Sequence, residues 1–463
     1  MRRRQLRRRR SQRRSRPVRR FPPTSPMRSD HTGPEFDVAI VGAGAAGLAA
    51  SAVLRAAGRR CILIEAGDRI GGRAHTLHPA LLGGACFDTG ATWLHAAERN
   101  PLVALARRRG IALEPAFRGG RRLLVAGRTA SDAEQAAYES SRAAWEALVT
   151  ARAGGPDCTL SEAGSARAGD PWTASIENWD GAIIAAADAG ELSLHDWHRN
   201  VLDDDNLSPP DGVGTLLETL LGPLAGPARL ATPVRGIAWG GTGCVLRCDG
   251  ACLTARAVIV TVSTGVLRSG HIAFEPELPP DILDAIDGLP MGLLSKLALP
   301  AAAPVGAIED DTLVERQVPE RGDPGMLVSV RPHGLGYVAG FFGGRHAWSL
   351  ADRPEAALAE ARAILREADS DAEPGAGGLV TGWGTDPLFG GAYAYCRPGR
   401  AGSRAALSRP LCDGRLSFAG EACRADGLAG TVGGAMLDGE RAAQAVLRCI
   451  IGLHSVPSLA ALG

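Results

Sequence analysis

Lysine is almost absent from this chain of 463 residues, because Lys296 is the only lysine among its 51 basic side chains. Aromatic residues make up 5% of the chain, and there are ten cysteines. Ten cysteines in so long a chain are too dilute for a disulfide scaffold, and their spacings match no zinc ribbon or CxxC pair. We therefore expect neither a disulfide-stapled domain nor a metal site.

Long hydrophobic runs are also missing. The longest apolar stretch, residues 38–54, is short of the roughly 20 residues that a bilayer crossing needs and is interrupted by three glycines. The overall composition, 45% hydrophobic and 22% charged, is that of a globular protein, and the length suggests two or three domains. We therefore expect a soluble, cytoplasmic protein without a membrane span.

Acidic residues are absent from the first 29 positions, which hold 13 of the arginines. The rest of the chain then has 38 basic and 50 acidic residues, so its body is acidic. A basic tail could contact nucleic acid or a membrane surface, but a block of like charges repels itself and does not pack. We expect residues 1–34 to be a disordered leader, or a start upstream of the true Met27, without nucleic-acid contact.

A complete βαβ pattern follows the leader. An apolar strand is predicted over residues 37–41, a helix rich in alanine over 43–57, and a second strand over 61–64. Such a unit is the first element of a parallel sheet that binds dinucleotides.

Three glycines stand between the first strand and the helix. Gly42, Gly44 and Gly47 form G-x-G-x-x-G, which serves respectively a tight turn, close approach to a pyrophosphate, and close packing of the helix on the strand. Glu65 ends the second strand, where it would accept hydrogen bonds from a ribose. Because an acid disfavours the 2′-phosphate of NADP, the pattern indicates FAD or NAD.

The segment DRIGGR (68–73), directly after Glu65, resembles the flavin amine oxidases, a superfamily of monoamine oxidases, polyamine oxidases and lysine-specific histone demethylases. Further motifs of this superfamily follow in order: FDTGATWLH (87–95), DGVGTLLETLLG (211–222), RLATPVRGI (229–237), AVIVTVSTGVL (257–267), MGLLSKLALP (291–300), WGTDPLFGGAYAYCRPG (383–399), FAGEAC (418–423) and GTVGGA (430–435).

This resemblance implies an α/β fold, in which a Rossmann-like FAD-binding domain carries an interleaved α+β substrate-binding domain. The FAD-binding domain would comprise residues 35–110, 212–290 and 386–453, and the substrate-binding domain residues 111–211 and 291–385, with 454–463 as a tail. The flavin ring would lie at their junction, a usual place for a ligand pocket.

The resemblance also assigns cofactor contacts. These are Gly42, Gly44, Gly47, Glu65, Arg73, Val234, Trp383, Glu421 and Val432. A helix that begins near Thr431 or Val432 would point its positive end at the flavin pyrimidine. Ala392 stands where monoamine oxidases have the cysteine that bonds the flavin, so we expect non-covalent FAD.

Four residues are the candidates for catalysis. Lys296 is a compact ammonium with an adjustable pKa inside an apolar segment, a role that arginine cannot fill, and the matching lysine of the resembling enzymes holds a water near flavin N5. Tyr393 matches one wall of the aromatic cage of monoamine oxidases, and Thr431 replaces the aromatic residue of the opposite wall. His95 could bind the substrate nitrogen or relay a proton.

The implied reaction is oxidation of the carbon next to an amine nitrogen, with hydride passing to flavin N5. An imine, then an aldehyde, and hydrogen peroxide from oxygen would be the products, with a small-molecule amine as substrate. The GATWLH segment and the acidic body favour a polyamine-like substrate. An amino-acid or other amine oxidase, a desaturase or porphyrinogen-type flavoprotein, and a catalytically silent FAD-binding scaffold stay open as alternatives.

Overall fold

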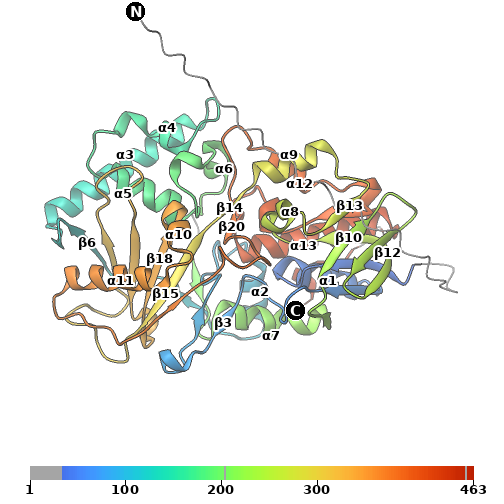
Figure 1. Ribbon diagram of the computed structural model, residues 1–463, viewed down its shortest axis with the longest axis horizontal. Coiled ribbons are helices and arrows are strands. Elements are labelled where there is room, and N and C mark those ends of the chain that lie inside the picture. The colour runs from blue at the N-terminus through green and yellow to red at the C-terminus, as the bar shows by residue number, and fades with distance from the viewer. Residues whose placement is uncertain (1–33, 203–204, 454–455, 463) are drawn as a thin grey trace, which may run out of the picture. The chain divides into compact units, whose positions relative to one another are not determined.

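The computed structural model describes residues 34–202, 205–453 and 456–462, and two large sheets organise this part of the chain (Figure 1). The predicted leader lies outside the described residues except for Pro34. The helices are α1 (Ala45–Ala56), α2 (Pro101–Arg108), α3 (Asp132–Arg152), α4 (Leu160–Ala163), α5 (Thr173–Glu177), α6 (Leu194–Arg199), α7 (Val213–Ala225), α8 (Thr264–Ser269), α9 (Pro280–Gly288), α10 (Gly344–Leu350), α11 (Pro354–Ala368), α12 (Ser403–Leu407) and α13 (Val432–Cys449).

The first sheet is built around the predicted βαβ unit. Its order is β13-β10-β11-β12-β1-β2-β9, and β21 pairs with β12. β1 runs parallel to both β2 and β12, so the first strand of the chain is central and buried. Its strands are β1 (Phe36–Val41), β2 (Cys61–Ile64), β9 (Ala228–Arg229), β10 (Val234–Ala238), β11 (Cys244–Cys248), β12 (Ala251–Val260), β13 (Ala273–Glu275) and β21 (Leu416–Phe418).

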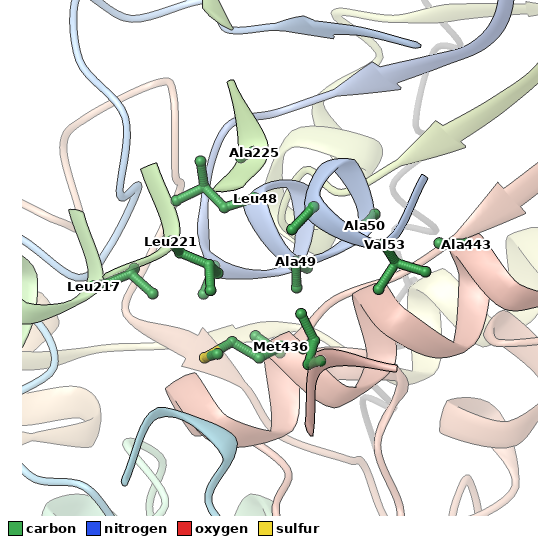
Figure 2. Close-up of a cluster of buried hydrophobic side chains, with 14 of the residues drawn as sticks. Leu48, Ala49, Ala50, Val53, Leu217, Leu221, Ala225, Met436 and Ala443 are labelled. Atoms are coloured by element: carbon green, nitrogen blue, oxygen red, sulfur yellow. The ribbon is translucent and has the colours of Figure 1, made fainter. Parts of the chain in front are cut away.

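Helix α1 is the centre of the adjacent hydrophobic core. It is buried from Ala45 to Leu54, because it packs against α13 on one side and α7 on another. Figure 2 shows Leu48 and Val53 of α1 among side chains of the two other helices, including Leu221 and Met436. The alanine-rich sequence of α1 permits this, because small side chains let three helices approach closely.

The second sheet has seven strands in the order β19-β15-β18-β17-β16-β6-β7. β15 lies between β18 and β19, and α11 packs across this sheet (Figure 1). Its strands are β6 (Arg121–Val125), β7 (Arg128–Thr129), β15 (Leu294–Pro300), β16 (Leu313–Arg316), β17 (Met326–Val330), β18 (Tyr337–Gly343) and β19 (Leu379–Val380). Three small antiparallel pairs complete the strands: β3 (Thr76–Leu77) with β4 (Phe87–Asp88), β5 (Glu114–Pro115) with β8 (Leu207–Ser208), and β14 (Met291–Gly292) with β20 (Tyr393–Ala394).

The observed elements confirm the predicted α/β class. β1, α1 and β2 match the predicted strand, helix and strand to within two residues at each end. The domain boundaries stay a prediction. The segment expected to be a tail is in part packed, because Leu459 is buried against the α1 core. Across the described residues, no helix combines the length and the apolarity that a bilayer crossing requires.

The contact between α1 and α13 depends on Gly439. A Cβ atom at this position would lie 2.1 Å from the carbonyl oxygen of Ala46, which is backbone and cannot move alone. Helix propensity by itself would favour alanine over glycine by about 1 kcal/mol. The close approach to the Ala46 carbonyl oxygen reverses the sign of this effect on stability, so glycine is favoured over alanine at position 439.

We expect Gly439→Ala to lower the free energy of unfolding by about 1–3 kcal/mol, as overpacking of a helix contact does. Urea or thermal denaturation measures this change. Gly169→Ala is the matched control, because Gly169 is exposed and a Cβ there would meet nothing within 4 Å. Equal stability of the two variants would contradict the proposed close packing.

Candidate active site and cofactor pocket

A cavity of about 310 Å³ lies at the carboxyl ends of the parallel strands of the first sheet. Val41 at the end of β1, Ile64 at the end of β2 and Thr261 just after β12 all line it. This is where open α/β sheets bind their ligands. Lys296 of β15 lines the same cavity, so the pocket receives side chains from both large sheets.

The three glycines of the first loop have different surroundings. Gly42 has a φ of +106°, and a Cβ there would lie 2.7 Å from Oγ1 of Thr261. Gly47 does not line the cavity, but a Cβ on it would lie 1.9 Å from the carbonyl oxygen of Gly42. Gly44 lines the cavity, and a Cβ on it would be in ordinary contact with the Cα of Gly72 at 3.9 Å. The loop is therefore held tightly at Gly42 and Gly47 and less tightly at Gly44.

Two helices present their N-termini to the cavity. The first turn of α1 contains no acid and no side-chain cap, and Ala45 and Ala46 line the cavity. The first turn of α13 also lacks an acid, and Val432 and Ala435 line the cavity. Free backbone N–H groups and the positive ends of the helix dipoles therefore face the space that a pyrophosphate and a flavin would fill.

Glu65 and Arg73 are oriented by neighbours but keep capacity for a ligand. The Glu65 carboxylate accepts hydrogen bonds from the backbone N–H of Ala43 (2.7 Å) and of Gly67 (2.8 Å), which leaves acceptor sites for ribose hydroxyls. Arg73 donates to Glu421 (2.9 Å) and to the carbonyl oxygen of Ala392 (2.8 Å), and a guanidinium has five N–H donors. These residues fit a dinucleotide that has both ribose and phosphate groups.

The remaining predicted cofactor residues also line the cavity. Val234 enters from β10, and Trp383 donates from Nε1 to the carbonyl oxygen of Thr89 (2.7 Å). The Trp383 ring packs edge-on against Phe389, with 4.9 Å between centroids. Of the predicted cofactor contacts, Gly47 alone does not line the cavity.

Lys296 is buried, with 5% of its surface exposed, and its ammonium meets three oxygen atoms. Nζ donates to the carbonyl oxygen of Asp88 at 3.1 Å and also contacts the carbonyl oxygen of Gly90 and Oγ1 of Thr92. Nζ lies 5.8 Å from the centre of the Phe341 ring. Burial lowers the pKa of Lys296 to about 8, against the opposing pull of the nearby Asp88 carboxylate.

Asp88 fixes the acceptors that surround this ammonium. Its own carboxylate is buried and accepts hydrogen bonds from the hydroxyl of Thr76 (2.5 Å) and from the backbone N–H of Val213 (2.9 Å), at the start of α7. Burial raises the pKa of the Asp88 carboxyl. The predicted role of Lys296 toward a water near the flavin stays a prediction.

His95 is held in one orientation. Its Nδ1 lies 2.8 Å from Oδ1 of Asn206, which can accept a hydrogen from it. Burial lowers the pKa of His95, and the charge of Lys296 lowers it further. The lowered pKa favours the neutral imidazole.

Tyr393 and Thr431 both line the cavity, but with different surroundings. The Tyr393 hydroxyl donates to the carbonyl oxygen of Ile184 (2.9 Å), and a Cβ on Gly430 would lie 3.3 Å from the ring. Thr431 caps α13, because its hydroxyl accepts from the N–H of Gly434 (2.9 Å) and donates to a backbone carbonyl. The Thr431 hydroxyl is thus engaged in the fold, and its place among the catalytic residues stays a prediction.

Several residues at or next to the cavity were not predicted from the sequence. Thr92 and Trp93 lie inside the FDTGATWLH motif, and their position within it could have identified them. Asn206 and Ile184 carried no such signal, because each reaches the site from a distant segment without a recognisable motif. Among the described residues, no three histidine, cysteine or acidic side chains group as metal ligands would.

The parallel pairing of β1 with β2 and β12, together with the glycine loop at the cavity, defines a dinucleotide-binding fold. Residues 45–447 match the family described as flavin containing amine oxidoreductase, and the chain belongs to this family. Its cofactor is therefore FAD.

Individual relatives fall into two groups. The chain is 30% identical to Polyamine oxidase 1 of Oryza sativa subsp. japonica, over 83% of this chain and 92% of that protein. It is 28% identical to Polyamine oxidase 4 of the same organism, over 91% of both chains. It is 29% identical to Lysine-specific histone demethylase 1 homolog 2, also from this rice, over 92% of this chain but only 58% of the demethylase. The chain thus spans little more than half of the demethylase relative.

No cysteine is among the described residues that line the cavity, and Ala392, which the resemblance aligns with the flavin-bonding cysteine of monoamine oxidases, does line it. We expect acid precipitation to leave the yellow chromophore in the supernatant, where its absorbance is measured. A yellow pellet that withstands washing in denaturant would overturn this prediction.

Proposed function

We propose that the protein oxidises an amine at the carbon next to its nitrogen and passes the two electrons to oxygen, which gives an imine and hydrogen peroxide. Water then hydrolyses the imine to an aldehyde and releases ammonia or an amine. The observation that carries this proposal is that the only lysine of the chain is buried in the wall of the dinucleotide cavity. FAD, when bound there, supplies the acceptor for the two electrons and the hydrogen that leave the substrate carbon.

The residues around Lys296 select the neutral form of an amine. An alkylammonium has a pKa of about 10.4 in water, and its nitrogen lone pair is unavailable while it is protonated. An apolar wall penalises the charged form, and the ammonium of Lys296 repels it. The imidazole of His95, which lines the same cavity, is our candidate for the group that accepts the proton the substrate loses.

The kind of amine that serves as the substrate is the second part of the proposal. The GATWLH segment and the two relatives named polyamine oxidases support a polyamine-like substrate, while the demethylase relative, about as similar, supports a different amine. We place the protein in the cytoplasm on the sequence argument alone.

The decisive test records the flavin spectrum under anaerobic conditions during addition of spermine, spermidine, phenethylamine and L-amino acids, followed by air and a peroxide assay. We expect at least one amine to bleach the flavin and peroxide to appear with air. A fully loaded holoprotein that no amine bleaches would exclude amine oxidation and favour a desaturase, a porphyrinogen-type oxidase or a silent scaffold.

Replacement of Lys296 separates its role in the reaction from cofactor binding. We expect Lys296→Met to keep FAD, because the cofactor contacts lie elsewhere, and to slow anaerobic bleaching by roughly 100-fold or more, as loss of a proton-handling group does. Stopped-flow absorbance measures the rate, and the ratio of flavin to protein absorbance measures FAD content. Lys296→Arg is the matched control, because it keeps a charge but not an adjustable pKa, and it should not restore the rate. An unchanged rate in Lys296→Met would remove Lys296 from the reaction.

A further inference from the structure

Tyr393 is held by a segment that lies far from it in the sequence. Its hydroxyl donates to the main-chain carbonyl oxygen of Ile184 at 2.9 Å. Its main chain lies on β20, where Tyr393 is the register partner of Gly292 on β14. A Cβ on Gly292 would lie 2.5 Å from the carbonyl oxygen of Ala186. The segment that contains Ile184 and Ala186 therefore contacts both the hydroxyl of Tyr393 and the strand pair that carries its main chain.

This segment directly follows the π-helical turn over Asn178–Ile183. The N–H of Ile184 donates to the carbonyl oxygen of Trp179 at 3.0 Å, which is the five-residue hydrogen bond of a π-helix. Such turns are rare and are frequent at functional sites. Ile183 and Ile184 both line the cavity, so the turn ends at the site.

A glycine of the second sheet lets the turn take this position. Gly343 ends β18, and a Cβ there would overlap the carbonyl group of Ala182, with 2.5 Å to the carbonyl carbon. The φ of Gly343 is −135°, which any residue can adopt, so the backbone conformation does not require glycine. The close approach of the turn does. A side chain at position 343 must therefore displace the backbone of the turn.

The turn is also fastened by helix α3. The carboxylate of Asp180 accepts a hydrogen bond from Nε1 of the buried Trp145 at 3.0 Å, and it lies 3.6 Å from the guanidinium of Arg142. Both partners belong to α3. The turn is thus held between α3 and β18, so its last carbonyl groups form a rigid support.

The hydroxyl of Tyr393 is used by this support. Burial raises the pKa of the Tyr393 hydroxyl, so the hydroxyl keeps its hydrogen near neutral pH and donates it to Ile184. A Cβ on Gly430 would lie 3.3 Å from the ring, and Gly430 directly precedes Thr431, the cap of α13. The ring is therefore confined between the carbonyl of Ile184 and the chain that leads into α13.

We infer that the π-helical turn holds the Tyr393 ring in position at the cavity, and that Gly343 is a positioning residue because it lets the turn approach. The contact is a property of the fold, whereas its effect on the reaction rests on the proposed amine oxidation. A ring that is fixed before the amine binds does not have to be ordered on binding, as a preorganised wall requires.

A double-mutant cycle in urea unfolding tests the contact without any reaction. The variants of the holoprotein are Tyr393→Phe, which removes the hydroxyl and keeps the ring, Gly343→Ala, and the two combined, all at equal FAD concentration. We expect Tyr393→Phe to lower the midpoint of unfolding, and to have less than half of this effect in the Gly343→Ala background. The displaced turn will already have lost the hydrogen bond. Equal effects in the two backgrounds would contradict the inference.

Gly340→Ala is the matched control. Gly340 also lies on β18, but a Cβ there would meet the side chain of Leu297 at 2.7 Å and not the turn. Leu297 and Lys296 are consecutive on β15, so their side chains point to opposite faces of the sheet and the substitution does not press on Lys296. We expect Tyr393→Phe to have its full effect on the midpoint in the Gly340→Ala background.

The same variants measure the effect on the reaction. We expect Tyr393→Phe and Gly343→Ala each to slow anaerobic flavin bleaching at saturating amine by about fivefold, the size of one neutral hydrogen bond, with unchanged FAD content. The combined variant should be no slower than the slower single variant, because both changes remove the same contact. Gly340→Ala should bleach at the unmodified rate.

The outcomes separate the inference from the proposed function. An unmodified bleaching rate in Gly343→Ala, or multiplied effects in the combined variant, overturns the inference while amine oxidation stands. If Gly343→Ala does not fold, Tyr393→Phe decides: a lower midpoint with slower bleaching supports the inference, and no change in either overturns it. If no amine bleaches the flavin, the proposed function fails, and the unfolding cycle alone decides whether the turn holds Tyr393.

Discussion

The buried ammonium of Lys296 is the contact on which the geometry of the site depends. Lys296 belongs to β15 of the second sheet, and its Nζ donates to the main-chain carbonyl of Asp88. The carboxylate of the same Asp88 accepts from the N–H of Val213, at the start of a helix that packs on α1. The carbonyl and the carboxylate of Asp88 thus connect β15, the strand that contains Lys296, to α7 and, through its packing, to α1 beside the dinucleotide loop. A displacement of either sheet would leave a buried charge without an acceptor, which is costly.

The charges of the cavity follow from the same constraint. The polar end attracts anions through helix N-termini and Arg73, whose charge is shared with Glu421. The other end contains Lys296, whose pKa is lowered by burial, and His95, whose pKa is also lowered. Both groups therefore favour the uncharged form more than their free counterparts do, His95 also because of the charge of Lys296.

The residues at the dinucleotide end of the cavity could be predicted from local sequence patterns. The residues at the other end could not, because long-range packing brings them together. The strand, glycine loop and helix near Gly44 obey short-range rules of periodicity and turn geometry, and their predicted bounds agree closely with the structure. The burial of Lys296 was also predictable, from one ammonium in an apolar segment. No short-range rule could have brought Ile184 to the cavity or Asn206 to His95, because their contacts with Tyr393 and His95 span more than 100 residues of sequence. Thr431 shows the intermediate case, since its helix start was predicted but the use of its hydroxyl as the cap was not.

This difference explains why the family of the chain fixes its cofactor more firmly than its substrate. The motif that binds a dinucleotide consists largely of glycines and a helix N-terminus, which require a particular sequence at a particular spacing. The apolar lining near Lys296 comes from a π-helical turn, a loop and a strand, none of which belongs to the glycine loop. A polyamine oxidase and a demethylase both match the chain at about 30% identity, so the shared motifs do not separate the two kinds of substrate. We expect the chemistry of the cavity lining outside the glycine loop, rather than the motifs that identify the family, to govern which substrate is accepted.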